Sequence, residues 1–151
     1  MKAFKHILVP TDGTPLSLKA AKEAAGLAKD LHATVTALYV TPPWTPPMAD
    51  ESAVLVDMGY SEKAYQEAQA KQAEHALSKV ERTLADAKVK CEKVHANGNQ
   101  PWESIIKTAK SRKCDLIVMA SHGRRGLGAL ILGSETTKVL THSKTPVLVC
   151  R

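Results

Sequence analysis

The stretch "CDLIVMASHGRRGLGALILGSETTKV" (Cys114–Val139) joins an apolar run to a glycine-rich loop and then to the start of a helix. A short apolar run bounded by turn residues is typical of a buried strand. A helix is expected from about Ser134 to His142, after Gly133. A buried strand followed by a loop and a helix is the repeating unit of an α/β protein with a parallel sheet.

The rest of the chain repeats this unit. Strands are predicted within 6–13, 33–40, 89–97, 114–121 and 145–150, and helices within 17–31, 61–88, 100–113 and 134–142. Right-handed crossovers then give a doubly wound, mostly parallel five-stranded sheet with helices on both faces. The pattern allows the strand order 3-2-1-4-5 or 2-1-3-4-5. In the first order, strands 1 and 4 are neighbours where the winding reverses, and ligands bind beyond the carboxyl ends of such strands.

A proline-rich segment interrupts the alternation after the second strand. "TPPWTPPMAD" (41–50) holds four prolines in ten residues, which excludes a helix interior or an interior strand. We expect a long loop over 42–59, with Trp44 packed against it. Long loops in compact domains are often functional or mobile. No domain boundary is predicted within 1–151.

Composition narrows the classes of partner. The 21 basic and 15 acidic residues give a formal charge of +6, which favours anionic partners in general. Basic residues are scattered, and aromatic residues are only 4%, so nucleic acid is not the expected partner. The chain shows no signal peptide or membrane span, so we expect a cytoplasmic protein without a membrane partner. Cys91, Cys114 and Cys150 lack close pairing and are expected to be reduced thiols.

The glycine-rich loop has two interpretations. "GRRGLG" does not match GxGxxG, and no GxxxxGK[ST] is present, so the usual dinucleotide and P-loop motifs are excluded. Glycines still let backbone N–H groups approach an anion, the helix start at Gly133–Ser134 adds free N–H groups, and Arg124 and Arg125 could donate as well. Alternatively, Ser134 is only an N-cap and the glycines only shape a turn. Glu135, just inside the helix, weighs against phosphate.

The sequence resembles the universal stress protein family over nearly its whole length. The resemblance rests on "ILVPTDGTPLSLKAAKEAAGLAK" and on "DLIVMASHGRRGLGALILGSETTKVLTHSKTPVLVCR". The nucleotide-binding branch of that family carries a glycine, two residues, a second glycine, nine residues, and then Gly-Ser or Gly-Thr. Here the pattern falls on Ala120, Gly123 and Gly133–Ser134, with the nine-residue spacer kept and alanine in place of the first glycine.

This resemblance implies a Rossmann-like fold similar to the adenine nucleotide alpha hydrolases, with strand order 3-2-1-4-5. It also implies a homodimer through the edge strand Pro146–Cys150, an apolar strand whose open backbone groups invite pairing. The implied ligand is ATP, or ADP or AMP, with Mg²⁺ on the phosphates. Pro10 and Thr11 would shape a turn that places Asp12 at the adenine or ribose end. The other implied contacts are Val40 with the base, Met119 and Ala120 with the ribose, and Gly123, Arg124, Gly133, Ser134, Glu135 and Thr136 with the phosphates.

Several alternatives remain at the sequence level. Asp12 could simply form an Asx-turn. His122 could act as a general base or a phosphate donor, although a lone histidine in a loop more often does neither. The sequence offers no acidic pair for magnesium and no obvious base, so a nucleotide-responsive binding protein is favoured over an enzyme. A scaffold that binds no nucleotide is the second hypothesis, and a slow ATPase is the third. Protein partners are expected but not specified.

Overall fold

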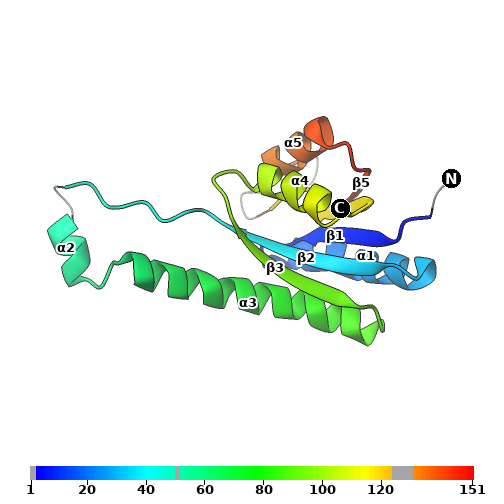
Figure 1. Ribbon diagram of the computed structural model, residues 1–151, viewed down its shortest axis with the longest axis horizontal. Coiled ribbons are helices and arrows are strands. Elements are labelled where there is room, and N and C mark those ends of the chain that lie inside the picture. The colour runs from blue at the N-terminus through cyan, green and yellow to red at the C-terminus, as the bar shows by residue number, and fades with distance from the viewer. Residues whose placement is uncertain (1–2, 50–51, 124–130) are drawn as a thin grey trace.

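The computed structural model describes residues 3–49, 52–123 and 131–151, and a single five-stranded parallel sheet runs through them (Figure 1). The strands are β1 (His6–Pro10), β2 (Thr34–Thr41), β3 (Cys91–Asn97), β4 (Leu116–Ala120) and β5 (Val147–Cys150). The helices are α1 (Pro15–Leu31), α2 (Ser52–Asp57), α3 (Glu62–Asp86), α4 (Pro101–Ser111) and α5 (Ser134–His142). The strand order is β3-β2-β1-β4-β5, which confirms the first of the two predicted orders.

Two aliphatic cores cover the two faces of the sheet. Successive residues of a strand point to opposite faces, and β1 shows this clearly. Ile7 and Val9 belong to the cluster that also contains buried residues of α1 and α3. Leu8 belongs to the cluster that contains buried residues of α4 and α5. All three side chains are fully buried, so β1 is sealed on both faces, as its continuous apolar run predicts.

The predicted loop over 42–59 is partly wrong. Its proline-rich part contains no helix or strand within 42–49, as expected, but residues Ser52–Asp57 form the short helix α2. The sequence "SAVLVD" contains neither proline nor glycine, so nothing there opposes a helical turn once the prolines have ended. Trp44 contacts Tyr60 just beyond the loop, with 6.5 Å between the ring centroids.

Helices α1, α3 and α4 end in the same way at the edge where the strands begin. Shortly after each helix one residue adopts a left-handed conformation, namely His32 (φ 53°), Lys88 (φ 60°) and Lys113 (φ 55°). The next residue buries its side chain and donates its N–H to a carbonyl of the last turn: Ala33 to Ala28 (2.9 Å), Val89 to Leu84 (2.9 Å) and Cys114 to Ala109 (2.8 Å). This is the Schellman arrangement, in which the left-handed position is usually glycine.

We predict that Lys88→Gly raises the stability of the protein. A left-handed conformation destabilises a residue with a side chain by about 1–2 kcal/mol, and glycine avoids this strain. Part of the gain is offset because glycine also raises the conformational entropy of the unfolded chain. The expected gain is about 0.5 kcal/mol, measured by urea unfolding. Lys71→Gly, in the interior of α3, is the matched control and should cost about 1 kcal/mol. Equal losses in both variants would contradict the prediction.

Candidate functional site

The central pairing of β1 with β4 brings two loops together at the carboxyl edge of the sheet. Ile7 and Leu8 lie opposite Leu116 and Ile117, so the turn after β1 and the loop after β4 leave the sheet side by side. The two loops touch at Asp12 and Gly123, because a Cβ atom built on Gly123 would lie only 2.6 Å from Asp12 Oδ2. The strand order reverses at this point, which is where open α/β sheets bind their ligands.

The turn after β1 is held by hydrogen bonds to β2, to α1 and within the turn itself. The Thr11 N–H donates to Leu38 O (2.8 Å), and the buried Thr11 hydroxyl is 3.0 Å from the hydroxyl of Ser17. Asp12 Oδ1 accepts from the N–H of Thr14 (3.0 Å) and from its hydroxyl (2.6 Å). The Asx-turn that the sequence allowed is therefore present. It uses one carboxylate oxygen of Asp12, while the other faces Gly123.

The loop after β4 is closed at its base by close backbone contacts. The Gly133 N–H donates to Ser121 O (2.8 Å), and the Ser121 N–H donates to Cys150 O (2.8 Å). A Cβ atom on Gly133 would lie 3.0 Å from His122 Cα, although the φ of Gly133 is an ordinary −61°. Glycine is thus favoured at this position by close approach and not by an unusual backbone conformation.

The amino terminus of α5 leaves backbone donors unpaired beside Gly133. Gly133 occupies the capping position and supplies no side-chain acceptor. The N–H groups of Ser134, Glu135 and Thr136 have no acceptor among the described residues, and the Ser134 side chain is exposed. The first N–H groups of a helix carry a partial positive charge. This end of α5 is therefore suited to hold an anion such as phosphate.

The side chains of Glu135 and Thr136 are engaged with the protein itself. The Thr136 hydroxyl, on a residue that is only 2% exposed, donates to Ala120 O (3.0 Å). Glu135 Oε2 accepts from the N–H of Trp102 in the first turn of α4 (2.8 Å), and its Oε1 lies 3.8 Å from Lys138 Nζ. Both residues would therefore contact a ligand through their backbone N–H groups. The carboxylate of Glu135 is occupied by α4, which weakens the objection that it would repel phosphate.

The other predicted residues end the central strands. Pro10 ends β1, Val40 is partly buried near the end of β2, and Met119 and Ala120 end β4 with 6% and 8% exposure. Ala120 lies in regular strand backbone paired with Cys150, so the fold itself has no need of glycine there. Arg124 lies outside the described residues.

Trp102 is a part of this region that the sequence analysis missed. Its backbone N–H binds Glu135 in the first turn of α5, and its indole ring packs on His142 in the last turn, with 4.6 Å between the ring centroids. Trp102 therefore fixes α5 at both ends. No sequence signal predicts this contact, because it depends on how α4 and α5 pack.

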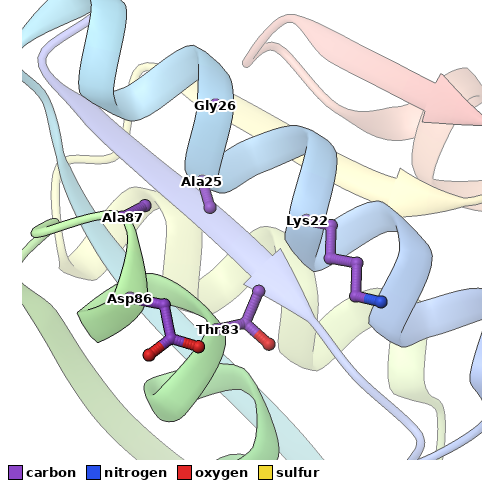
Figure 2. Close-up of a pocket in the computed structure, with 6 residues that line it drawn as sticks. All are labelled: Lys22, Ala25, Gly26, Thr83, Asp86 and Ala87. Carbon is purple, nitrogen blue, oxygen red and sulfur yellow. The ribbon is translucent and has the colours of Figure 1, made fainter.

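Neither the thiols nor a separate hollow adds reactive chemistry to the site. Burial raises the pKa of Cys91 and Cys114 to about 11, so both thiols stay protonated at neutral pH, and all three cysteines are free. A hollow of about 400 Å³ lies between α1 and the end of α3, away from the carboxyl edge (Figure 2). Its only charged lining residues are Lys22 and Asp86. Within the described ranges, no group of three or more His, Cys, Asp or Glu residues could hold a metal ion.

The sheet order, and the meeting of the β1 and β4 loops where that order reverses, define the class of protein: a Rossmann-like α/β domain. The family model described as "Universal stress protein family" matches residues 3–151. The chain belongs to the universal stress protein family.

Individual relatives agree over nearly the full length. Universal stress protein MJ0531 of Methanocaldococcus jannaschii is 36% identical over 98% of this chain and 82% of its own length. Universal stress protein YxiE of Bacillus subtilis is 31% identical over 98% of this chain and 99% of its own. The solved structure of the protein MJ0577 superimposes with a TM-score of 0.78 at 27% identity, covering 98% of this chain and 96% of the other. In the parts of the chain that the structure describes, no helix is both long and apolar enough to cross a bilayer.

We predict that Glu135→Ala destabilises the protein by about 1 kcal/mol, because it removes the acceptor that caps the first turn of α4. The midpoint temperature of thermal unfolding should fall by about 3 °C. Glu135→Gln keeps a side-chain oxygen at the same position and should lose less than half as much. If Gln and Ala are equally destabilising, the ion pair with Lys138 matters and the hydrogen bond to Trp102 does not.

Proposed function

We propose that this protein binds an adenine nucleotide, ATP in the first place, in the crevice between β1 and β4, and that it acts in the cytoplasm as a stress-response regulator. The observation that carries the proposal is the set of N–H groups at Ser134, Glu135 and Thr136, for which the described part of the chain supplies no acceptor. They lie next to Gly133, and the loop that Gly133 closes contacts Asp12 through Gly123. A nucleotide requires donors for its anionic phosphates at one end and a polar contact for its ribose or base at the other. The start of α5 and the turn at Asp12 would supply these two contacts.

Each residue has a role in this proposal. The phosphates bind the backbone N–H groups at the start of α5, the hydroxyl of Ser134 and the side chain of Arg124. Asp12 binds the ribose or adenine end beyond the turn that Pro10 and Thr11 shape. Val40 contacts the base, and Met119 and Ala120 lie along the ribose. Mg²⁺ would arrive with the phosphates, because the described residues form no cluster of metal ligands.

Solved structures with the same fold support an adenine ligand in general terms. A universal stress protein described in complex with cAMP superimposes with a TM-score of 0.69 at 21% identity. The universal stress protein of Archaeoglobus fulgidus described in complex with dAMP gives a TM-score of 0.69 at 16% identity. At these identities the similarity establishes a common fold and nothing further. It supports the proposal in that proteins of this architecture accommodate adenine nucleotides.

Binding is favoured over hydrolysis. Phosphoryl transfer requires a positioned water and charge neutralisation around the phosphates. His122 is 3.1 Å from the hydroxyl of the neighbouring Ser121, and Asp12 Oδ1 is used by Thr14. Neither is arranged as a free base. A slow ATPase remains a second candidate, and it requires phosphate release that disappears in Asp12→Asn or Ser134→Ala.

We further propose that the protein acts as a homodimer through the open edge of β5. The strand pairs with β4 on one side only, and Leu148 is 44% exposed. An unpaired edge strand with exposed apolar side chains readily pairs with a symmetry mate. Nucleotide occupancy would then change the surface that the dimer offers to protein partners.

The nucleotide proposal is tested by extraction. Protein purified without added nucleotide is denatured, and the supernatant is run on an anion-exchange column beside ATP, ADP and AMP standards. We expect a near-stoichiometric adenine peak, and a thermal shift with Mg-ATP for any protein that carries no nucleotide. Gly123→Val should abolish both, because its Cβ would approach Asp12 Oδ2 to 2.6 Å.

The matched control is Gly26→Val, where a Cβ meets no heavy atom within 4 Å. This variant should bind as the unmodified protein does. A protein with neither an adenine peak nor a thermal shift would refute nucleotide binding. It would favour the scaffold hypothesis, in which the glycines only shape the turn.

We predict that Leu148→Lys converts the dimer into a monomer in sedimentation equilibrium. A lysine on an edge strand opposes pairing with a second copy. Leu140→Lys is the control, since Leu140 is similarly exposed (42%) but lies on α5. A dimer that survives Leu148→Lys and dissociates in Leu140→Lys would place the interface on α5.

A further inference from the structure

The fold gathers cations at the amino edge, which we define as the edge where the five strands begin, opposite the proposed nucleotide site (Figure 1). Each helix that leads back into the sheet brings at least one, either in its last turn or in the connection that follows. Eight basic residues occupy these positions: Lys5, Lys29, Lys88, Lys90, Lys110, Arg112, Lys113 and Lys144. All eight are exposed. The same segments contain three carboxylates, Asp30, Asp86 and Asp115, and a fourth, Glu92, is the second residue of β3.

Strand pairing sets these residues in a row. Lys5 O accepts from the Thr34 N–H (3.0 Å), and Lys90 O accepts from the Val35 N–H (3.0 Å), so the starts of β1, β2 and β3 are aligned. His6 O accepts from the Asp115 N–H (2.8 Å), which aligns the start of β4. Neighbouring strands lie about 4.8 Å apart, so the row crosses the sheet within roughly 20 Å.

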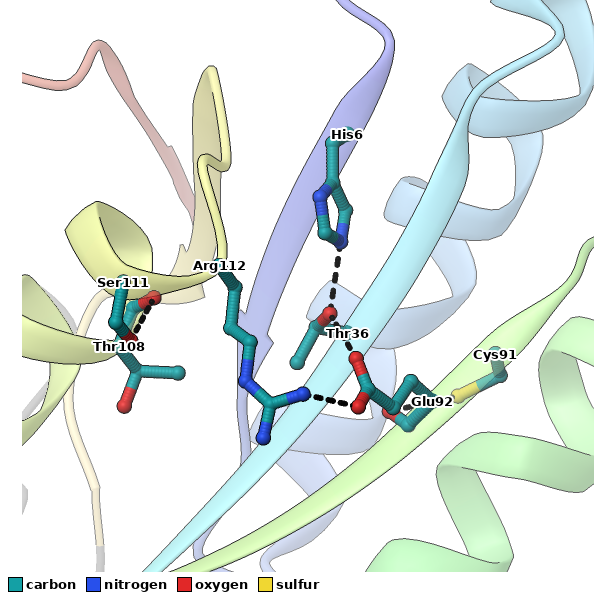
Figure 3. A network of polar contacts seen from close by, with 7 residues as sticks. All are labelled: His6, Thr36, Cys91, Glu92, Thr108, Ser111 and Arg112. Atoms are coloured by element: carbon teal, nitrogen blue, oxygen red, sulfur yellow. Dashed lines mark hydrogen bonds and ion pairs between the residues drawn. The ribbon is translucent and has the colours of Figure 1, made fainter.

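Two of the four carboxylates are bound to groups other than lysine side chains. Asp115 accepts from the backbone N–H groups of Lys5 (2.9 Å) and His6 (3.0 Å). Glu92 forms an ion pair with Arg112 and also accepts from Thr36, which in turn contacts the His6 ring (Figure 3). Among the described residues, none of the seven lysines lies within 4.0 Å of a carboxylate oxygen. Lys5 Nζ donates to Leu31 O (3.1 Å), but within the described residues no carboxylate neutralises any of the seven lysine charges.

Basic residues also occupy the strained, left-handed backbone positions at this edge. The three left-handed positions after α1, α3 and α4 hold His32, Lys88 and Lys113, although glycine would relieve the strain at each. A favourable interaction with the helix carboxyl terminus offsets part of the cost. All three residues nevertheless add cationic or titratable groups to the same edge.

The residue types at the edge favour one class of anionic partner. Lysines outnumber arginines seven to one among the eight basic residues, and lysine acts as a point charge, whereas arginine favours bidentate recognition of nucleic acids. Of the described residues, those with large exposed apolar side chains lie elsewhere, over 48–60, at Ile131, on α5 and on β5. Among the described residues, the edge therefore offers no exposed Phe, Tyr or Trp ring on which bases could stack. A diffuse array of lysines suits a surface whose charged groups can move to meet it.

We propose that the amino edge docks the protein on an anionic lipid surface. The absence of a segment that could span a bilayer predicts no membrane partner, but electrostatic docking needs no such segment. The lysines are scattered along the sequence and become neighbours only in the sheet. Docking at this edge leaves the proposed nucleotide site, at the other end of the strands, turned away from the lipid. The proposal therefore does not depend on nucleotide binding.

The experiment is cosedimentation of the full chain with vesicles of phosphatidylcholine containing 30% phosphatidylserine, at low ionic strength. We expect binding that is absent with pure phosphatidylcholine and lost at high salt. Lys90→Gln, Lys113→Gln and Lys144→Gln together should weaken partitioning about 100-fold, since each lysine near the surface contributes about fivefold. The control removes the same charge elsewhere, by Lys63→Gln, Lys71→Gln and Lys107→Gln, and should change partitioning less than threefold. Circular dichroism and thermal unfolding check that both variants fold.

Three results would overturn the proposal. The first is no binding to anionic vesicles at low salt. The second is an equal loss in the edge variant and the control variant, which would show that only net charge matters. The third is tighter binding to random-sequence duplex DNA than to vesicles at equal phosphate concentration, with the same loss in the edge variant, which would assign the edge to nucleic acid instead.

Discussion

The position of β1 between β2 and β4 is the constraint on which the rest of the structure depends. Its three buried residues Ile7, Leu8 and Val9 are shared between the cores on the two faces. At the carboxyl end, this position sets Asp12 against Gly123. At the amino end, the Asp115 carboxylate binds the N–H groups of Lys5 and His6 and fixes the start of the strand. Because both ends of β1 are fixed, both edges of the sheet have a defined geometry.

The candidate nucleotide site is built mainly from backbone. The donors at the start of α5 are N–H groups, and the side chains of Glu135 and Thr136 serve to hold that helix in place. A site built from backbone explains why glycine is favoured at 133, where a side chain would meet His122 at the base of the loop. It also explains why alanine is tolerated by the fold at 120, where the backbone is ordinary strand.

A parallel sheet covered by helices has two unlike edges. Helices begin at the carboxyl edge and end at the amino edge, so the first offers N–H groups to anions and the second favours cations near exposed carbonyls. In this chain α5 begins at the carboxyl edge with N–H donors that find no acceptor within residues 3–49, 52–123 and 131–151, while lysines follow three helices at the amino edge. Both edges are therefore suited to phosphate, the first through backbone groups and the second through exposed lysine side chains. The exposed edge of β5 is a third, apolar surface between them.

The sequence by itself determined the fold class, the strands, four of the five helices, and the loop that begins after Ala120, because apolar periodicity and glycine spacing are local properties. It missed α2, since four nearby prolines suggested a longer loop than the one that exists. It left the strand order open, because order depends on which crossovers pack best. The contact of Trp102 with both ends of α5, and the meeting of lysines from five separate segments, were decided only by the tertiary structure. Such contacts join residues far apart in the chain, and no local pattern records which of them the folded sheet will place side by side.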